Sequence, residues 1–160
     1  MFDEKLATKH LNSFLKTYKI KVCKWSVTDC GRAYISKKEI KIPKPTNVIR
    51  FCICMHEIKH IIDGNKGKLY QKEFACEKFA IEQAESLGFD CSIYKEIARR
   101  YVVMNIAKGF CRGLNLKNIE PEIIKFCNVD FSSWEYKRVF VTGWGSSNVR
   151  IGKPLEIGIQ

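Results

Sequence analysis

Hydrophobic and polar positions recur in two different periods, which divide the start of the chain into a helix and a group of strands. Over residues 3–18 the hydrophobic positions fall at helical spacing, and Asp3 can cap that helix. Shorter runs bounded by turn residues then predict strands at residues 20–27, residues 32–36 and Glu39–Pro43. The chain therefore begins with a helix that is followed by a small sheet.

Two prolines limit the third predicted strand. Pro43 ends it and Pro45 follows. Because proline cannot donate a ladder hydrogen bond, a strand of this kind is often found at the edge of a sheet. We therefore predict that Glu39–Pro43 is an edge strand with a free backbone, to which a substrate peptide would add as a further strand. The expected substrate-binding residues are Glu39, Ile40, Lys41 and Ile42.

The chain continues with helical patterns up to about residue 131. These patterns span residues 47–62, 70–87, 92–110 and 120–126. Gly64 and Gly88 stand where glycine commonly ends a helix, and Pro121 stands at a first helical position. From residue 132 the chain is aromatic and glycine-rich without helical periodicity. We predict one domain over residues 1–131 and an extension, residues 132–160, that packs on it.

The second predicted helix contains the motif HExxH, as His56-Glu57-Ile58-Lys59-His60. Residues four positions apart lie one turn apart on the same helix face, so His56 and His60 can bind one zinc ion. The glutamate beside the first histidine can then take a proton from water that the metal activates. The motif therefore predicts a hydrolytic zinc site with Glu57 as general base.

A catalytic zinc ion needs a third protein ligand. His10, Cys52 and Cys76 are candidates without a convincing spacing to the motif. The preferred candidate is Glu73, because a short loop after His60 makes the next helix antiparallel and brings Glu73 level with it.

Glu77 lies one turn further along that helix, level with His56, where it can hydrogen-bond a liganding imidazole. The two glutamates could exchange these roles, and both could instead belong to a solvated helix face that pairs with lysines. The residue that stabilises the reacting carbonyl oxygen is left open among Tyr34, Tyr70, Tyr94 and Tyr101.

The composition is that of a globular protein in a reducing compartment. The 160 residues are 46% hydrophobic and 28% charged, with no apolar run long enough for a membrane span. The eight cysteines form no CxxC pair, which favours buried thiols over disulfides or a zinc knuckle. The acidic N-terminus lacks the features of a secretory signal. We therefore expect a cytoplasmic protein without membrane contact.

The formal net charge of +11 favours anionic partners such as nucleic acid or acidic protein. The basic residues are spread along the chain, so the charge could also serve solubility alone. The oligomeric state is left open by the sequence.

The motif region resembles a known family. HEIKH followed by Glu73-Phe74-Ala75-Cys76-Glu77-Lys78-Phe79-Ala80 is similar to the gluzincin pattern HExxH…ExxA(D/N)xxA. The Phe79-Ala80 ending resembles the ImmA/IrrE-type metallopeptidases of phages, mobile elements and bacterial stress regulation. Cys76 and Glu77 stand where that pattern has alanine and Asp or Asn.

The resemblance covers about residues 31–90 and implies an α+β, zincin-like fold. In such a fold an N-terminal helix and a small mixed sheet precede the HExxH helix, which packs on the glutamate-bearing helix, and further helices follow. It implies Zn²⁺ held by His56, His60 and Glu73, Glu57 as base, and a regulatory protein as substrate.

The expected function is therefore a zinc endopeptidase of narrow specificity that acts on a protein or peptide. Two alternatives stay open. One is a basic module on a zincin fold that binds nucleic acid or protein without turnover. The other is a SprT-like protease acting at DNA, although such proteases use a third histidine and none is suitably placed here.

Overall fold

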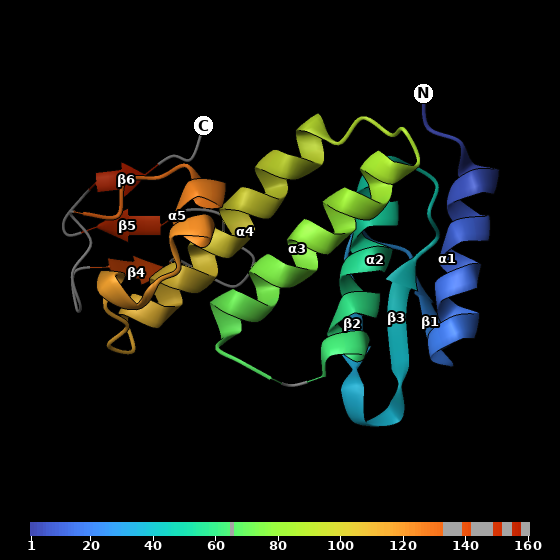
Figure 1. The fold of residues 1–160 in the computed structure, drawn as a ribbon, viewed down its shortest axis with the longest axis horizontal. Coiled ribbons are helices and arrows are strands. Elements are labelled where there is room, and N and C mark those ends of the chain that lie inside the picture. The colour runs from blue at the N-terminus through green and yellow to red at the C-terminus, as the bar shows by residue number, and fades with distance from the viewer. Residues whose placement is uncertain (65, 133–138, 142–148, 152–154, 158–160) are drawn as a thin grey trace. The chain divides into compact units, whose positions relative to one another are not determined.

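The computed structural model describes residues 1–64 and 66–132, and the backbone of three short strands between residues 139 and 157. The chain forms two compact units (Figure 1). The first contains Met1–Gly67 and Ala75–Lys95, and the second contains Lys68–Phe74 and Glu96–Gln160. The fold is mixed α+β, as the sequence predicts.

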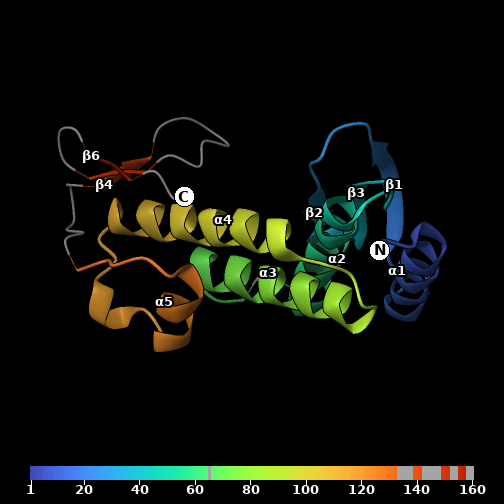
Figure 2. The same cartoon turned by 90° about the horizontal axis from the view of Figure 1, so that it is seen from above.

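The first unit opens with helix α1, Glu4–Tyr18. The Asp3 carboxylate accepts a hydrogen bond from the Leu6 N–H at 3.0 Å, so Asp3 caps the helix as predicted. Ala7 and Leu11 are fully buried on the inner face of α1. Figure 2 shows α1 on the same side of the first unit's sheet as the next helix, α2 (Val48–Asp63).

The sheet of the first unit has the strand order β1-β3-β2. Its strands are β1 (Lys21–Ser26), β2 (Arg32–Tyr34) and β3 (Glu39–Pro43). Strand β3 pairs in parallel with β1 and antiparallel with β2, and a short 3-10 turn, Ile35–Lys37, connects β2 to β3. Of the described strands of this sheet, β1 and β2 are therefore the edges.

The prediction that Glu39–Pro43 is an edge strand is wrong. Pro43 is the last residue of β3, where a missing N–H interrupts no further ladder bond, and it lies opposite Ser26 in register. Ile40 and Ile42 are fully buried and Pro43 is buried as well. With a partner on each side, β3 offers no free backbone for strand addition. The predicted binding of a substrate strand to the backbone of Glu39, Ile40, Lys41 and Ile42 is therefore not possible.

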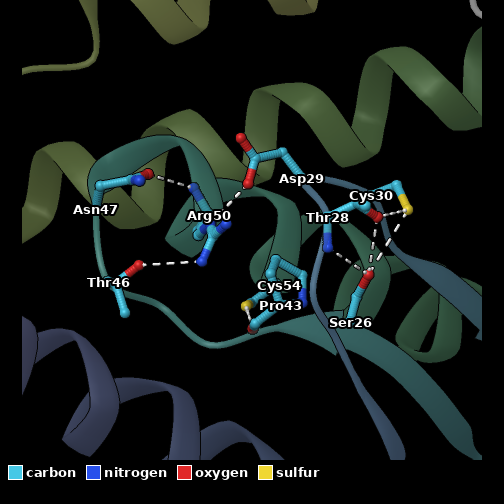
Figure 3. A network of polar contacts seen from close by, with 9 residues as sticks. All are labelled: Ser26, Thr28, Asp29, Cys30, Pro43, Thr46, Asn47, Arg50 and Cys54. Atoms are coloured by element: carbon cyan, nitrogen blue, oxygen red, sulfur yellow. Dashed lines mark hydrogen bonds and ion pairs between the residues drawn. The ribbon is translucent and has the colours of Figure 1, made fainter.

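Helix α2 packs against β3 and β2 and carries the HExxH motif. The Asn47 side chain accepts a hydrogen bond from the Arg50 N–H at 2.9 Å and caps the helix. At the other end Gly64 has φ 68°, which favours glycine and stops the helix there. The Cys54 thiol donates to the Pro43 carbonyl at 3.2 Å and joins α2 to the end of β3 (Figure 3).

Helix α3 spans Leu69–Ser86 and runs antiparallel to α2, as predicted. Cys52 of α2 contacts the Ala80 carbonyl, with 3.8 Å between the sulfur and oxygen atoms, and His56 contacts Glu77 at 3.2 Å. As the α2 position rises by four residues, the α3 position falls by three, which is the relation expected for antiparallel helices. Helix α4, Ser92–Phe110, starts in the first unit, where Lys95 pairs with Glu85 at 2.6 Å.

The second unit is built on the rest of α4, which packs with a 3-10 turn, Leu116–Asn118, and helix α5, Pro121–Cys127. Its core contains Phe110, Phe131 and Val102, and also Tyr70 from the first turn of α3. Strands β4 (Val139–Val141), β5 (Val149–Ile151) and β6 (Leu155–Ile157) form an antiparallel sheet. The expectation that residues 132–160 pack on a single domain 1–131 stays a prediction. No helix among the described residues has the length and apolarity to cross a membrane.

Candidate metal centre

The two motif histidines point at one another from consecutive turns of α2. Their Nε2 atoms lie 3.1 Å apart, and their ring centroids lie 4.8 Å apart at an interplanar angle of 74°. Two imidazole nitrogens bound tetrahedrally to one zinc ion at about 2.0–2.1 Å would lie about 3.3–3.4 Å apart. The separation of the His56 and His60 nitrogens therefore fits a shared metal ion.

The other ring nitrogen of His56 is held by α3. The His56 Nδ1 atom lies 3.2 Å from Oε1 of Glu77, and both residues are buried, at 7% and 4% exposure. A carboxylate in this position keeps the imidazole proton on Nδ1 and leaves the Nε2 lone pair to face a metal ion. Glu77 thus lies level with His56, where the sequence placed it.

Tyr94 of α4 completes this buried contact on the side of Glu77. Burial raises the pKa of Tyr94 well above its ordinary value, and the charge of Glu77 and a hydrogen bond to it raise that pKa further. The hydroxyl therefore stays protonated and donates to the carboxylate. The sequence offered Tyr94 only as one of four tyrosines near the reacting carbonyl, because no spacing relates it to Glu77.

Cys76 supplies a third donor beside the histidines. Among the described residues, His56, His60 and Cys76 form the group able to hold a metal ion, with their ligand atoms all within 4.8 Å of one another. Imidazole and thiolate are both ordinary zinc ligands, so the chemistry of this set fits the metal. It does not by itself distinguish zinc from other transition metals.

The remaining candidates for the third ligand differ in their surroundings. Glu73 is buried in the first turns of α3, within the segment Lys68–Phe74 of the second unit, and its role as a ligand stays a prediction. His10 lies 2.9 Å from the Gln83 amide oxygen through Nε2. Cys52 contacts the Ala80 carbonyl, and burial raises the pKa of its thiol. His10 and Cys52 therefore have other roles in the packing of the first unit.

The general base predicted from the motif, Glu57, is buried against the segment that leads into β2. A Cβ atom placed on Gly31 would lie 2.5 Å from Cγ and 2.7 Å from Oε1 of Glu57. Both distances are too short for real side chains, so the carboxylate occupies this place only because residue 31 has no side chain. In the sequence, Cys30-Gly31 indicates a turn, and nothing in the pattern relates it to Glu57.

The loop that carries Gly31 is tied to the start of α2 (Figure 3). The Arg50 guanidinium donates to the Asp29 carboxylate at 2.6 Å. Within the loop, the Thr28 hydroxyl lies 2.9 Å from the Cys30 sulfur and the Ser26 hydroxyl lies 3.7 Å from it. These hydrogen bonds, chiefly that of Thr28, lower the pKa of the exposed Cys30 thiol.

Comparison of the chain with known proteins gives no match to a protein-family model, a curated protein or a solved structure. The features of the chain that bear on its function are the convergence of His56 and His60, the burial of Glu57 and the contact between His56 and Glu77.

The contact at Gly31 predicts an energetic coupling with Glu57. Gly31→Ala should destabilise the protein by about 1–3 kcal/mol, seen as a melting temperature roughly 3–8 °C lower, because the added methyl group displaces the Glu57 side chain. In a Glu57→Ala background the same substitution should be neutral or slightly stabilising, since the obstructing atoms are gone. Thermal unfolding of the four proteins measures the coupling. Equal losses in both backgrounds would show that the contact does not exist.

The lowered pKa of Cys30 predicts selective alkylation near neutral pH. Iodoacetamide should modify Cys30 faster than Cys111, which is also exposed but whose pKa is raised by burial. The difference should narrow as the pH rises above both pKa values, because both thiols are then ionised. Peptide mass spectrometry measures the two rates. Thr28→Val is the matched variant, and an unchanged Cys30 rate in that variant would contradict the role of the hydrogen bond.

Proposed function

We propose that this protein is a zinc-dependent endopeptidase of narrow specificity whose active site is built on α2. The observation that carries the proposal is the 3.1 Å approach of the His56 and His60 Nε2 atoms, with Glu57 between them in the chain. A carboxylate beside Nδ1 of a histidine whose Nε2 faces a second imidazole is the arrangement that orients metal-binding histidines. The donors suit a metal ion.

The chemistry assigns separate roles to the residues. A zinc ion held by the histidines would polarise the peptide carbonyl and lower the pKa of water. Glu57 accepts a proton from the attacking water and passes it to the leaving amine. Glu77 keeps His56 in the tautomer that binds metal, and Tyr94 holds Glu77 in place. The resemblance to ImmA/IrrE-type metallopeptidases supports a regulatory protein as the substrate.

The edge strand β2 is the better place for a substrate peptide. Among the described strands β2 pairs with β3 alone, so one side of its backbone can accept a further strand. Gly31, which comes directly before β2, lies against Glu57. A peptide added to Arg32–Tyr34 would therefore lie beside the general base.

The third ligand comes from α3 in this proposal, and two residues compete for the role. Cys76 is the donor found with the histidines in the first unit. Glu73 is the donor that the sequence pattern favours, and it lies three residues earlier, on the same face of α3 by helical periodicity. The two differ in chemistry, because a thiolate and a carboxylate give different spectra with a substituted metal.

Metal analysis tests the site and its third ligand together. The purified protein, supplied with zinc, should hold about one zinc ion per chain, and His60→Ala should lose it. Glu73→Ala and Cys76→Ser should retain different amounts of zinc, and the variant that loses more zinc identifies the third ligand. With Co²⁺ in place of zinc, a thiolate ligand adds a strong near-ultraviolet charge-transfer band that Cys76→Ser removes. Absence of zinc from the unsubstituted protein would refute the proposal.

Glu57→Gln separates catalysis from metal binding. The variant should keep its metal, because the amide replaces no ligand, while hydrolysis falls by at least about 100-fold, since the general base is lost. A peptide library digested by each protein and read by mass spectrometry measures the hydrolysis. Unchanged cleavage by the variant would exclude Glu57 as the general base, and no cleavage by the metal-loaded protein would leave a metal-binding module without the proposed activity.

A further inference from the structure

Three basic residues stand in one row across the sheet of the first unit. Lys24 of β1 lies opposite Lys41 of β3, and Arg32 of β2 lies opposite Lys41 on the other side. Residues in register on neighbouring strands project from the same face of a sheet, and adjacent strands are about 4.8 Å apart. The three cationic side chains therefore leave one face at intervals of about one strand spacing.

The neighbouring row leaves this charge uncompensated. It contains Lys21, Glu39 and Tyr34, and Lys21 pairs with Glu39 at 3.7 Å. Glu39 is the single acidic residue among these six positions, and Lys21 already engages it. No described acidic side chain forms an ion pair with Lys24, Lys41 or Arg32.

This face lies opposite the helices. Ile40 and Ile42 alternate with Glu39 and Lys41 along β3 and are fully buried, which places the charged residues on the other face. Figure 2 shows that α1 and α2 lie on the buried side of the sheet. Lys24 and Arg32 are exposed and Lys41 is half-buried. We call the face that bears these three residues the basic sheet face.

Protection against aggregation accounts for only part of this arrangement. Edge strands often carry lysine because it discourages pairing with other chains, which would account for charges on β1 and β2. Lys41, however, lies on the central strand, whose backbone is already paired on both sides. Like charges that face one another across strands destabilise a sheet, so the row carries a cost that a bound polyanion would offset.

We propose that the basic sheet face binds the phosphate backbone of nucleic acid. Phosphates form a regular array of anions, which a row of cations at strand spacing can contact together. Tyr34 places an aromatic ring on the same face, where a base of a single strand can stack. The net charge of +11 adds a long-range electrostatic attraction toward the same polyanion. This proposal does not depend on the peptidase activity.

Fluorescence anisotropy with labelled oligonucleotides tests the proposal. The metal-loaded protein is titrated into a single-stranded DNA of about 20 nucleotides and into the corresponding duplex, at several salt concentrations. We expect binding that weakens steeply with salt. Tighter binding of the single strand would indicate a stacking contribution from Tyr34, and similar binding of both would indicate contacts with phosphates alone. No binding of either probe at low salt would overturn the proposal.

Two matched triple variants show where the nucleic acid binds. Lys24, Arg32 and Lys41 are replaced by Gln in one variant, and the exposed Lys5, Lys9 and Lys16 of α1 in the other. Both variants lower the net charge by three. The first variant should bind single strands at least about tenfold more weakly. Its slope of log affinity against log salt concentration should also be smaller by about two units, whereas the second variant should change little.

Further controls separate the proposal from its rivals. Equal losses of DNA affinity in the two triple variants would show that binding depends on net charge alone. That result would overturn the assignment of the binding site to this face. Stronger binding of labelled poly-glutamate than of DNA would assign the face to an acidic protein instead. Melting temperature and zinc content check folding and the metal site independently. The single variants Lys24→Gln and Arg32→Gln, both at exposed edge positions, provide the test if the triple variant does not fold.

Discussion

The contact between His56 and the Glu77 carboxylate is the interaction on which the rest of the site depends. Both groups are buried, and a buried carboxylate is costly unless hydrogen-bond donors surround it. The Tyr94 hydroxyl donates to this carboxylate, and the Nδ1 atom of His56 lies 3.2 Å from it. Because the pair joins α2 to α3, it fixes the relative position of the helices and also the direction in which His56 Nε2 points. Helix packing and the orientation of the metal donors are therefore set by the same atoms.

The sheet imposes a second constraint on the same helix. Glu57 fits only against a residue without a Cβ atom, and Gly31 is held at that place by a loop that Asp29 and Arg50 tie to the first turn of α2. The proposed base is thus confined between the helix that carries it and the strand that would carry the substrate. A carboxylate confined in this way loses little freedom when a reaction begins, which is how proteins make general bases effective.

Local patterns were sufficient for the elements and for much of the site. The helix cap at Asp3 and the i, i+4 spacing of the histidines are short-range features, and the structure places them as predicted. A short loop implied antiparallel helices, and that was enough to bring Glu77 to His56. Strand order is different, because it depends on pairings between distant segments. The proline at the end of β3 wrongly indicated an edge strand. Gly31 contacts Glu57 and Tyr94 contacts Glu77, and no local spacing in the sequence relates the members of either pair.

The central position of β3 separates two kinds of recognition. Its backbone is paired on both sides, and Ile40 and Ile42 are committed to the core. Only the outward side chains of β3 can therefore meet a partner, and Lys41 can do so only by its charge. Backbone recognition is instead proposed for β2, which directly follows the Gly31 that lies against Glu57. A single three-stranded sheet could thus hold a polyanion on its outer face and present a peptide at one edge, since the two contacts use different atoms of the sheet.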